Sequence, residues 1–162
     1  MIDESLRPSP DAEAILRTAG WSPDREVDTS GWVDMLRRDD NEVFPHAKAI
    51  LKSFGGLRLE HEGFGGISSQ GFQIDPASWY YERERISDIE EIIGHKVCPL
   101  GEAFGAAMLA VLDNEGVISE FEGSVVLLGN NWRAALDYLL LDRGTTIRLA
   151  EDYEPIDHSP LT

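Results

Sequence analysis

Side chains able to support catalytic or metal chemistry are scattered along this sequence and show no catalytic spacing. Zinc sites are built from histidine and cysteine ligands at short, regular spacings. The chain has one cysteine, no HExxH sequence, and four histidines that lie far apart, at His46, His61, His95 and His158. Glu90 and Glu91 share a segment with His95, but neighbouring residues on a helix point in different directions, so we expect a solvated surface there. The sequence therefore predicts no metal site.

A glycine-rich stretch at residues 66–71 has the glycine spacing of a phosphate-binding loop. Such loops need a lysine and a serine or threonine directly after the second glycine, and a helix that begins there. Phe72 and Gln73 stand at those positions, and we expect a strand to follow. No GxSxG nucleophile elbow occurs either. We therefore expect no cofactor, no catalytic residue and no enzymatic activity; the alternative left open is a hydrolase whose nucleophile and base meet only in the folded chain.

The segment at residues 79–85, with the sequence WYYERER, is the strongest candidate for a contact surface. Its three adjacent aromatic residues cannot all face one core, because neighbouring side chains diverge in both helices and strands. Trp, Tyr and Arg are also the residues that anchor protein interfaces. The alternative is that Trp79 and Tyr80 are core residues and Tyr81 lies at the edge. The residues expected to contact a partner are Trp79, Tyr80, Tyr81, Glu82, Glu84, Asp88, Glu91, Asp113, Glu115, Glu120 and Glu122.

The chain is strongly acidic, with 30 Asp and Glu against 14 Lys and Arg and a formal net charge of −16. The excess is uneven: residues 1–60 hold twelve acids and eight bases, whereas residues 61–162 hold eighteen acids and six bases. Such a field repels nucleic acids and anionic membrane surfaces and attracts basic partners. Ordinary solubility is the alternative explanation of the charge.

Length and composition indicate a single globular domain of 162 residues, 42% of them hydrophobic. No apolar run approaches the roughly 20 residues that a membrane span needs. Residues 1–17 carry four acids and no apolar stretch, unlike a secretory signal peptide. Cys98, the single cysteine, cannot form an internal disulfide, and we expect it to be a small buried hydrophobic residue. These features favour a cytoplasmic protein that does not bind membranes.

Helical signals dominate the first part of the chain. Ser9 is a suitable N-cap for a helix that starts at Pro10 and ends at Gly20. A short helix is expected at residues 31–38. A third helix is expected from Pro45, with apolar residues at helical spacing up to the pair Gly55-Gly56 that ends it.

Strand signals follow, with one more helical segment between them and one after them. Strands are expected at residues 57–61, 72–74 and 124–128, and at the edge at 145–149. A hairpin is expected around residues 113–116, with Gly116 in the left-handed conformation. Helices are expected in the second half of residues 78–94 and after a cap at Asn130 or Asn131. This order of helical and strand segments along the chain predicts an α+β fold with a mostly antiparallel sheet and helices on one side.

Several short signatures, in this order and spacing, resemble the third subfamily of the SUKH superfamily. The most specific are the junction from the helix at 47–51 into Phe54-Gly55-Gly56-Leu57, and the element Cys98-Pro99-Leu100-Gly101 after Gly94. The others are Ala19-Gly20-Trp21 with Arg25, Asp75-Pro76, residues 113–116 with Val117, and Leu128-Gly129 before Ala135-Leu136. The resemblance covers about residues 19–141. We expect a SUKH-like domain at 1–149 and an acidic tail at 150–162.

The resemblance implies an immunity protein of bacterial polymorphic or contact-dependent toxin systems. Such proteins bind a cognate toxin, often a nuclease, and block it, and the family has no catalytic motif to transfer. A nuclease presents a basic surface to nucleic acid, which an acidic inhibitor can occupy. Other branches of the superfamily are regulatory or scaffolding domains, so a ligand-binding or regulatory scaffold without a toxin partner is the alternative. The toxin's identity and the oligomeric state stay open.

Overall fold

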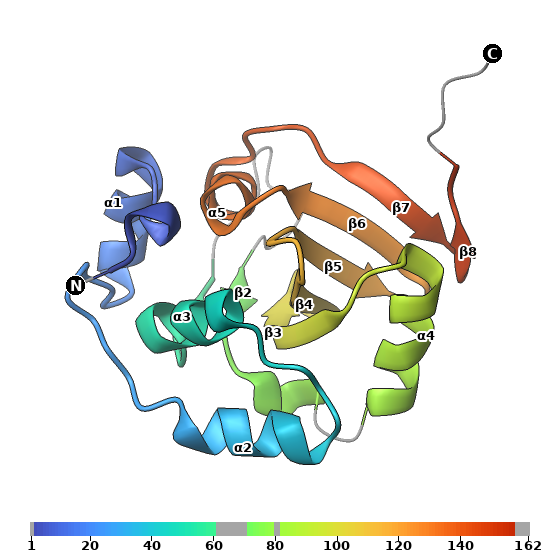
Figure 1. Cartoon of the computed structure of the whole chain (residues 1–162). Helices are drawn as coiled ribbons and strands as arrows, with labels where there is room; N and C mark the ends of the chain where they lie inside the picture. Colours follow the sequence, from blue (N-terminus) through green and yellow to red (C-terminus); the bar gives the residue numbers. More distant parts are fainter. Residues whose placement is uncertain (1, 61–70, 80–81, 158–162) are drawn as a thin grey trace.

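The computed structural model describes residues 2–60, 71–79 and 82–157, and in this part the chain folds as five α-helices and an eight-stranded sheet (Figure 1). The helical elements are η1 (Glu4–Leu6), α1 (Pro10–Thr18), α2 (Ser30–Arg38), α3 (Pro45–Phe54), η3 (Pro76–Trp79), α4 (Arg83–Ile93) and α5 (Trp132–Leu141). The strands are β1 (Arg58–Leu59), β2 (Phe72–Gln73), β3 (Val97–Ala103), β4 (Ala107–Leu112), β5 (Val117–Phe121), β6 (Ser124–Gly129), β7 (Ile147–Glu151) and β8 (Glu154–Pro155).

The helix ends follow local sequence chemistry, and the expected helices are confirmed. Ser9 caps α1 by accepting a hydrogen bond from the Ala12 amide, and Pro10 takes the first helical position. The side chain of Asn131 caps α5 by accepting from the Ala134 amide at 2.9 Å. These caps satisfy amide groups that have no partner inside the helix, so α1 and α5 start where the sequence places a capping residue.

The sheet is a simple antiparallel meander. Each strand pairs with the next one in the chain, in the order β1 to β8. The strands β3 to β6, and β7 and β8, are joined by short turns, as antiparallel neighbours can be. The longer connections carry helices, with η3 and α4 between β2 and β3 and α5 between β6 and β7. The predicted α+β class with an antiparallel sheet is confirmed.

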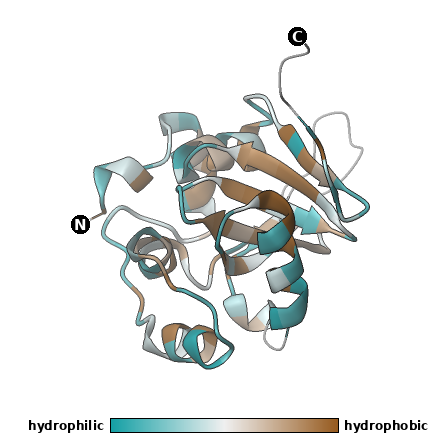
Figure 2. Cartoon of the chain, turned by 45° about the vertical axis from the view of Figure 1, so that its right-hand side comes forward, coloured by the Kyte–Doolittle hydropathy of each residue, from teal (hydrophilic) through white to brown (hydrophobic). Residues whose placement is uncertain are grey.

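Both faces of the sheet are buried, as the strand β4 shows. Leu109 and Val111 point into a core that α1, α3 and α5 cover, whereas Met108, Ala110 and Leu112 point into a second core under α4. Helices α1, α3 and α5 thus lie on one face, whereas α4 closes the other (Figure 1). The expectation that the helices pack on one side therefore needs correction for α4, because the second face of the sheet is apolar as well. In Figure 2 the central strands are brown and the surrounding helices carry teal segments, which matches a sheet enclosed by amphipathic helices.

Two local expectations need correction. In the β4–β5 turn it is Glu115, with φ of 74°, that takes the left-handed conformation, and not Gly116. The acidic stretch after residue 149 is not a free tail up to residue 157, because β7 continues to Glu151 and pairs with β8. His61, most of the glycine-rich stretch at 66–71, and residues 158–162 lie outside the described residues.

Cys98 lies on β3 with no exposed surface. Burial raises the pKa of its thiol to about 12, because the thiolate would be desolvated there. The expected role of Cys98 as a small buried hydrophobic residue is confirmed. A thiol in this setting is an inert packing element at neutral pH.

We expect Cys98 to be unreactive towards an excess of a chromogenic disulfide reagent at pH 8 in the folded protein, because the thiolate population is very small. One equivalent of thiol is expected to react promptly once the chain is unfolded in urea. The absorbance of the released chromophore measures both states, and fast reaction of the native protein would contradict the structure.

Gly101 provides a second test of the fold, because the backbone of β2 and of the residues that follow it lies directly against this residue. An added Cβ would lie 1.9 Å from the carbonyl oxygen of Gln73 and 2.8 Å from the amide nitrogen of Asp75. We expect Gly101→Ala to lower the free energy of unfolding by about 3 kcal/mol, since both obstacles are backbone atoms. Urea denaturation measures the change.

Gly31→Ala is the matched control, because Gly31 lies inside α2 and nothing stands within 4 Å of an added Cβ. This control is expected to stabilise the protein by up to about 1 kcal/mol through helix propensity. Equal stabilities for the two variants would show that the packing around Gly101 is not as described.

Candidate functional site

An acidic stripe runs along the outer side of α4. Glu84, Asp88 and Glu91 recur at spacings of four and three residues, which places them on one face of the helix. Ile86 and Ile89 on the opposite side are fully buried in the second core. All three acids are exposed, and none forms an ion pair with another described residue. The stripe therefore presents uncompensated negative charge to solvent.

The β7–β8 hairpin lies beside α4 and adds more acids to this side of the molecule (Figure 1). Its turn residues Asp152 and Tyr153 have φ values of 51° and 64°, as a two-residue type I′ turn requires. Tyr153 is 48% exposed, and Asp152 and Glu154 on either side of it are exposed. The hairpin thus carries an exposed aromatic ring between two carboxylates.

The β5–β6 turn is held against this hairpin. The Tyr153 amide donates a hydrogen bond of 3.1 Å to the Gly123 carbonyl. A Cβ at Gly123 would lie 2.6 Å from the Tyr153 amide nitrogen, so only glycine permits this approach. Glu122, next to Gly123, is exposed. We use the name acidic face for the exposed carboxylates of these three elements: Glu84, Asp88, Glu91, Glu122, Asp152 and Glu154.

Acids on α1 are compensated, in contrast to those of the acidic face. Glu13 lies 3.3 Å from Arg7 and 3.0 Å from Arg17, and Asp11 lies 2.8 Å from Arg143. The two carboxylates of α1 are therefore neutralised by their own ion pairs, unlike those of the acidic face.

Trp79 and Glu120, two residues expected to contact a partner, are buried. Trp79 is 9% exposed, and its Nε1 donates to the Gly101 carbonyl at 2.7 Å. Glu120 has no exposed surface, and its carboxylate lies 2.9 Å from the guanidinium of Arg85 and accepts from the Gly123 amide. Both side chains are therefore structural, and we leave them out of the acidic face. Tyr80 and Tyr81 lie outside the described residues.

Arg85 links these buried groups. Its guanidinium lies over the Trp79 ring, 5.5 Å from the centroid, in a cation–π contact. Burial opposes the charged form, but the Glu120 carboxylate, with smaller effects from Tyr153 and Glu82, outweighs it and raises the pKa of Arg85 above its ordinary value. Glu82 itself is exposed at the start of α4. The Arg85–Glu120 ion pair thus lies at the base of the acidic face.

Asp113 and Glu115, in the β4–β5 turn, lie at the other end of α4. The Asp113 carboxylate accepts from the Lys96 amide at 3.0 Å and lies 2.8 Å from Nδ1 of His95. The Lys96 hydrogen bond, with a smaller effect from His95, lowers the pKa of Asp113. Asp113 therefore holds the turn to the loop after α4, whereas Glu115 is free at the surface.

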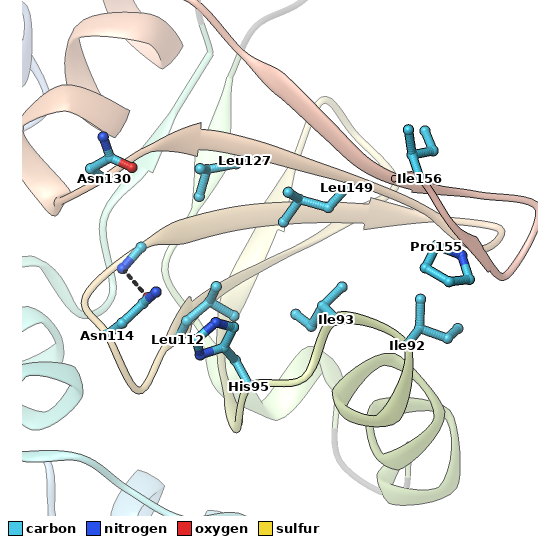
Figure 3. Close-up of a pocket in the computed structure, with 11 residues that line it drawn as sticks. Ile92, Ile93, His95, Leu112, Asn114, Leu127, Asn130, Leu149, Pro155 and Ile156 are labelled. Atoms are coloured by element: carbon cyan, nitrogen blue, oxygen red, sulfur yellow. Dashed lines mark hydrogen bonds between the residues drawn. The ribbon is translucent and has the colours of Figure 1, made fainter. Parts of the chain in front are cut away.

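An apolar groove of about 330 Å³ separates the end of α4 from the β7–β8 hairpin (Figure 3). Ile92 and Ile93 form one side, and the strands β6 and β7 form the other through Leu127 and Leu149. The remaining lining residues are His95, Leu112, Asn114, Gly116, Asn130, Pro155 and Ile156. Ile92 and Ile93 both pack against the second core but stay partly exposed, so each contributes apolar surface to the groove.

Two searches of the described residues bear on other functions. No group of three or more histidine, cysteine or acidic side chains in that part of the chain is placed to hold a metal ion. None of the helices described there has the length and apolarity required to cross a bilayer.

Comparison with known proteins identifies the family. Neither a curated protein nor a solved structure matches the chain. Residues 8–142, most of the chain, match the family described as SUKH-3 immunity protein. The match starts earlier than the resemblance seen in the sequence and covers every element from α1 to α5. The chain belongs to the SUKH-3 immunity protein family.

Proposed function

We propose that this immunity protein binds a cognate toxin with a basic surface, a nuclease, and neutralises it through the acidic face without catalysing a reaction. The observation that carries the proposal is the concentration of unpaired carboxylates on α4, the β7–β8 hairpin and the β5–β6 turn. We further propose that the protein acts in the cytoplasm, where its single buried cysteine needs no oxidising conditions.

The charge chemistry supports this choice of partner. A nuclease must present lysine and arginine side chains to the phosphates of its substrate. Carboxylates spaced along a rigid helix can meet the same cations and exclude the nucleic acid. Because the acids of the acidic face form no ion pair with the residues that the structure describes, no such pair has to break when the toxin binds. Glu82, Glu115 and Asp113 extend the proposed surface at its two ends.

Exposed aromatic groups supply the apolar part of such an interface. Tyr153 is 48% exposed between Asp152 and Glu154, and Phe121 is 49% exposed beside Glu122. Aromatic residues are enriched at the energetic centres of protein interfaces, and tyrosine adds a hydroxyl group that can hydrogen bond. We propose Tyr153, which sequence analysis did not single out, as an anchor in place of Trp79.

The triple variant Glu84→Gln, Asp88→Asn, Glu91→Gln tests the proposal. We expect the variant to bind the toxin encoded beside this gene about tenfold more weakly at low salt. The reason is that three intermolecular ion pairs are lost, and each exposed ion pair contributes about 0.5 kcal/mol to the binding free energy. The affinity of the variant is also expected to fall less steeply with added salt, because fewer charges take part. Isothermal titration calorimetry at two salt concentrations measures both effects.

The matched control changes the net charge by the same amount on the N-terminal side. Glu4→Gln, Asp24→Asn, Asp34→Asn neutralises three exposed acids on η1, the loop between α1 and α2, and α2. We expect this control to bind the toxin nearly as tightly as the unmodified protein. If the two triple variants lose affinity equally, net charge alone acts and the acidic face is not the binding site.

A further inference from the structure

We propose that the groove in Figure 3 receives one apolar side chain of the toxin, carried on a segment in which lysine or arginine residues flank it. This inference rests on the proposed function and names the chemistry that the binding site selects. The acidic face alone would accept any cationic surface. A groove that requires an apolar residue at a set position among the cations would add specificity for one toxin over other basic proteins.

The walls of the groove are apolar side chains left partly exposed. Ile92, Leu127 and Leu149 pack on the second core but keep part of their surface in solvent. They come from α4, β6 and β7, and Figure 3 shows them facing the same space. A volume of about 330 Å³ is larger than a leucine or phenylalanine side chain requires and is at the lower end of the range for ligand sites. The groove therefore has enough volume to hold one inserted side chain of this size.

Polar groups stand at one end of the groove. Asn114, Asn130 and His95 line that end (Figure 3). The Asn114 Oδ1 atom accepts from the Gly116 amide at 3.0 Å, which leaves its NH₂ group as a donor. A chain segment that enters the groove has backbone carbonyl groups to satisfy, and an amide donor at the rim meets that need.

Acidic residues neighbour the lining residues along the chain on α4, β8 and the β4–β5 turn. Asp88 lies one helical turn before Ile92, Glu154 precedes Pro155 of the lining, and Asp113 precedes Asn114. Of the cations nearby, Arg148 lies 3.1 Å from Glu151, so its charge is compensated. Lys96 remains at one end, next to His95. The rim as a whole is negative, which complements cationic residues on both sides of an inserted apolar side chain.

The negative charge around the groove also argues against two other kinds of occupant, a second copy of this chain and a segment without cationic residues. A second copy of this chain would bring another net charge of −16 and its own acidic face to the groove. An acidic or purely apolar segment would leave the rim carboxylates desolvated without partners. A basic segment with an apolar anchor is the occupant that fits both parts of the groove. Its apolar side chain packs against the apolar walls, and its cations pair with the carboxylates of the rim.

Ile92→Asn tests the groove without altering charge. We expect about tenfold weaker binding of the toxin encoded beside this gene, because an apolar wall becomes polar. The slope of affinity against salt concentration is expected to stay unchanged, in contrast to the α4 triple variant. Ile15→Asn on α1, a partly buried isoleucine packed against the other core, is the matched control and is expected to keep full affinity in its folded form.

Asn130→Trp provides a second route if Ile92→Asn does not fold. Asn130 is exposed at the polar end of the groove, so an indole there fills the space without removing a core contact. We expect it to weaken toxin binding by a similar factor, with unchanged thermal stability. Normal affinity of a folded groove variant, while the α4 triple variant still binds weakly, would overturn the groove inference and leave the proposed function standing. Absence of toxin binding by the unmodified protein would refute both.

Discussion

The carboxylate of Glu120 is the group on which the functional side of this molecule depends. It has no exposed surface, and its charge is met by Arg85 from α4 and by the amide of Gly123. Removing one partner from a buried ion pair costs about 3–5 kcal/mol, so the pair strongly favours one position of α4 on the sheet. Arg85 in turn lies on the Trp79 ring. A single buried charge therefore sets where the acidic stripe and the β5–β6 turn stand relative to one another.

The second constraint is that both faces of the sheet must be covered. Helices α1, α3 and α5 cover one face, and α4 is the helix that covers the other. It does so with Ile86 and Ile89 and leaves its opposite side to solvent. The β7–β8 hairpin extends the sheet beyond the area that one helix can shield. The groove is the space left between them, so core packing and the candidate binding site have a common origin.

Some of the fold could be predicted because the responsible interactions are local. The cap at Ser9, the proline at position 45 and the glycine pair after Phe54 each act within one turn, and those helices were predicted correctly. Strand β3 was not predicted. Its residues are almost all buried, so they show no alternation, and Pro99 and Gly101 weaken the strand pattern further. The β7–β8 hairpin was missed because a type I′ turn formed by Asp152 and Tyr153 lacks the usual glycine or asparagine.

The sequence by itself determined the net charge, the main helix boundaries and the α+β class, because composition and short-range periodicity carry that information. The family was indicated by the resemblance of short signatures in their order and spacing. Only the tertiary structure decided which carboxylates are available to a partner. Glu120 and Glu122 stand two residues apart with the same chemistry, yet one is buried against Arg85 and the other is exposed. The ion pair joins residues 35 positions apart, and no local pattern specifies such a contact. Burial and long-range pairing are properties of the packed chain.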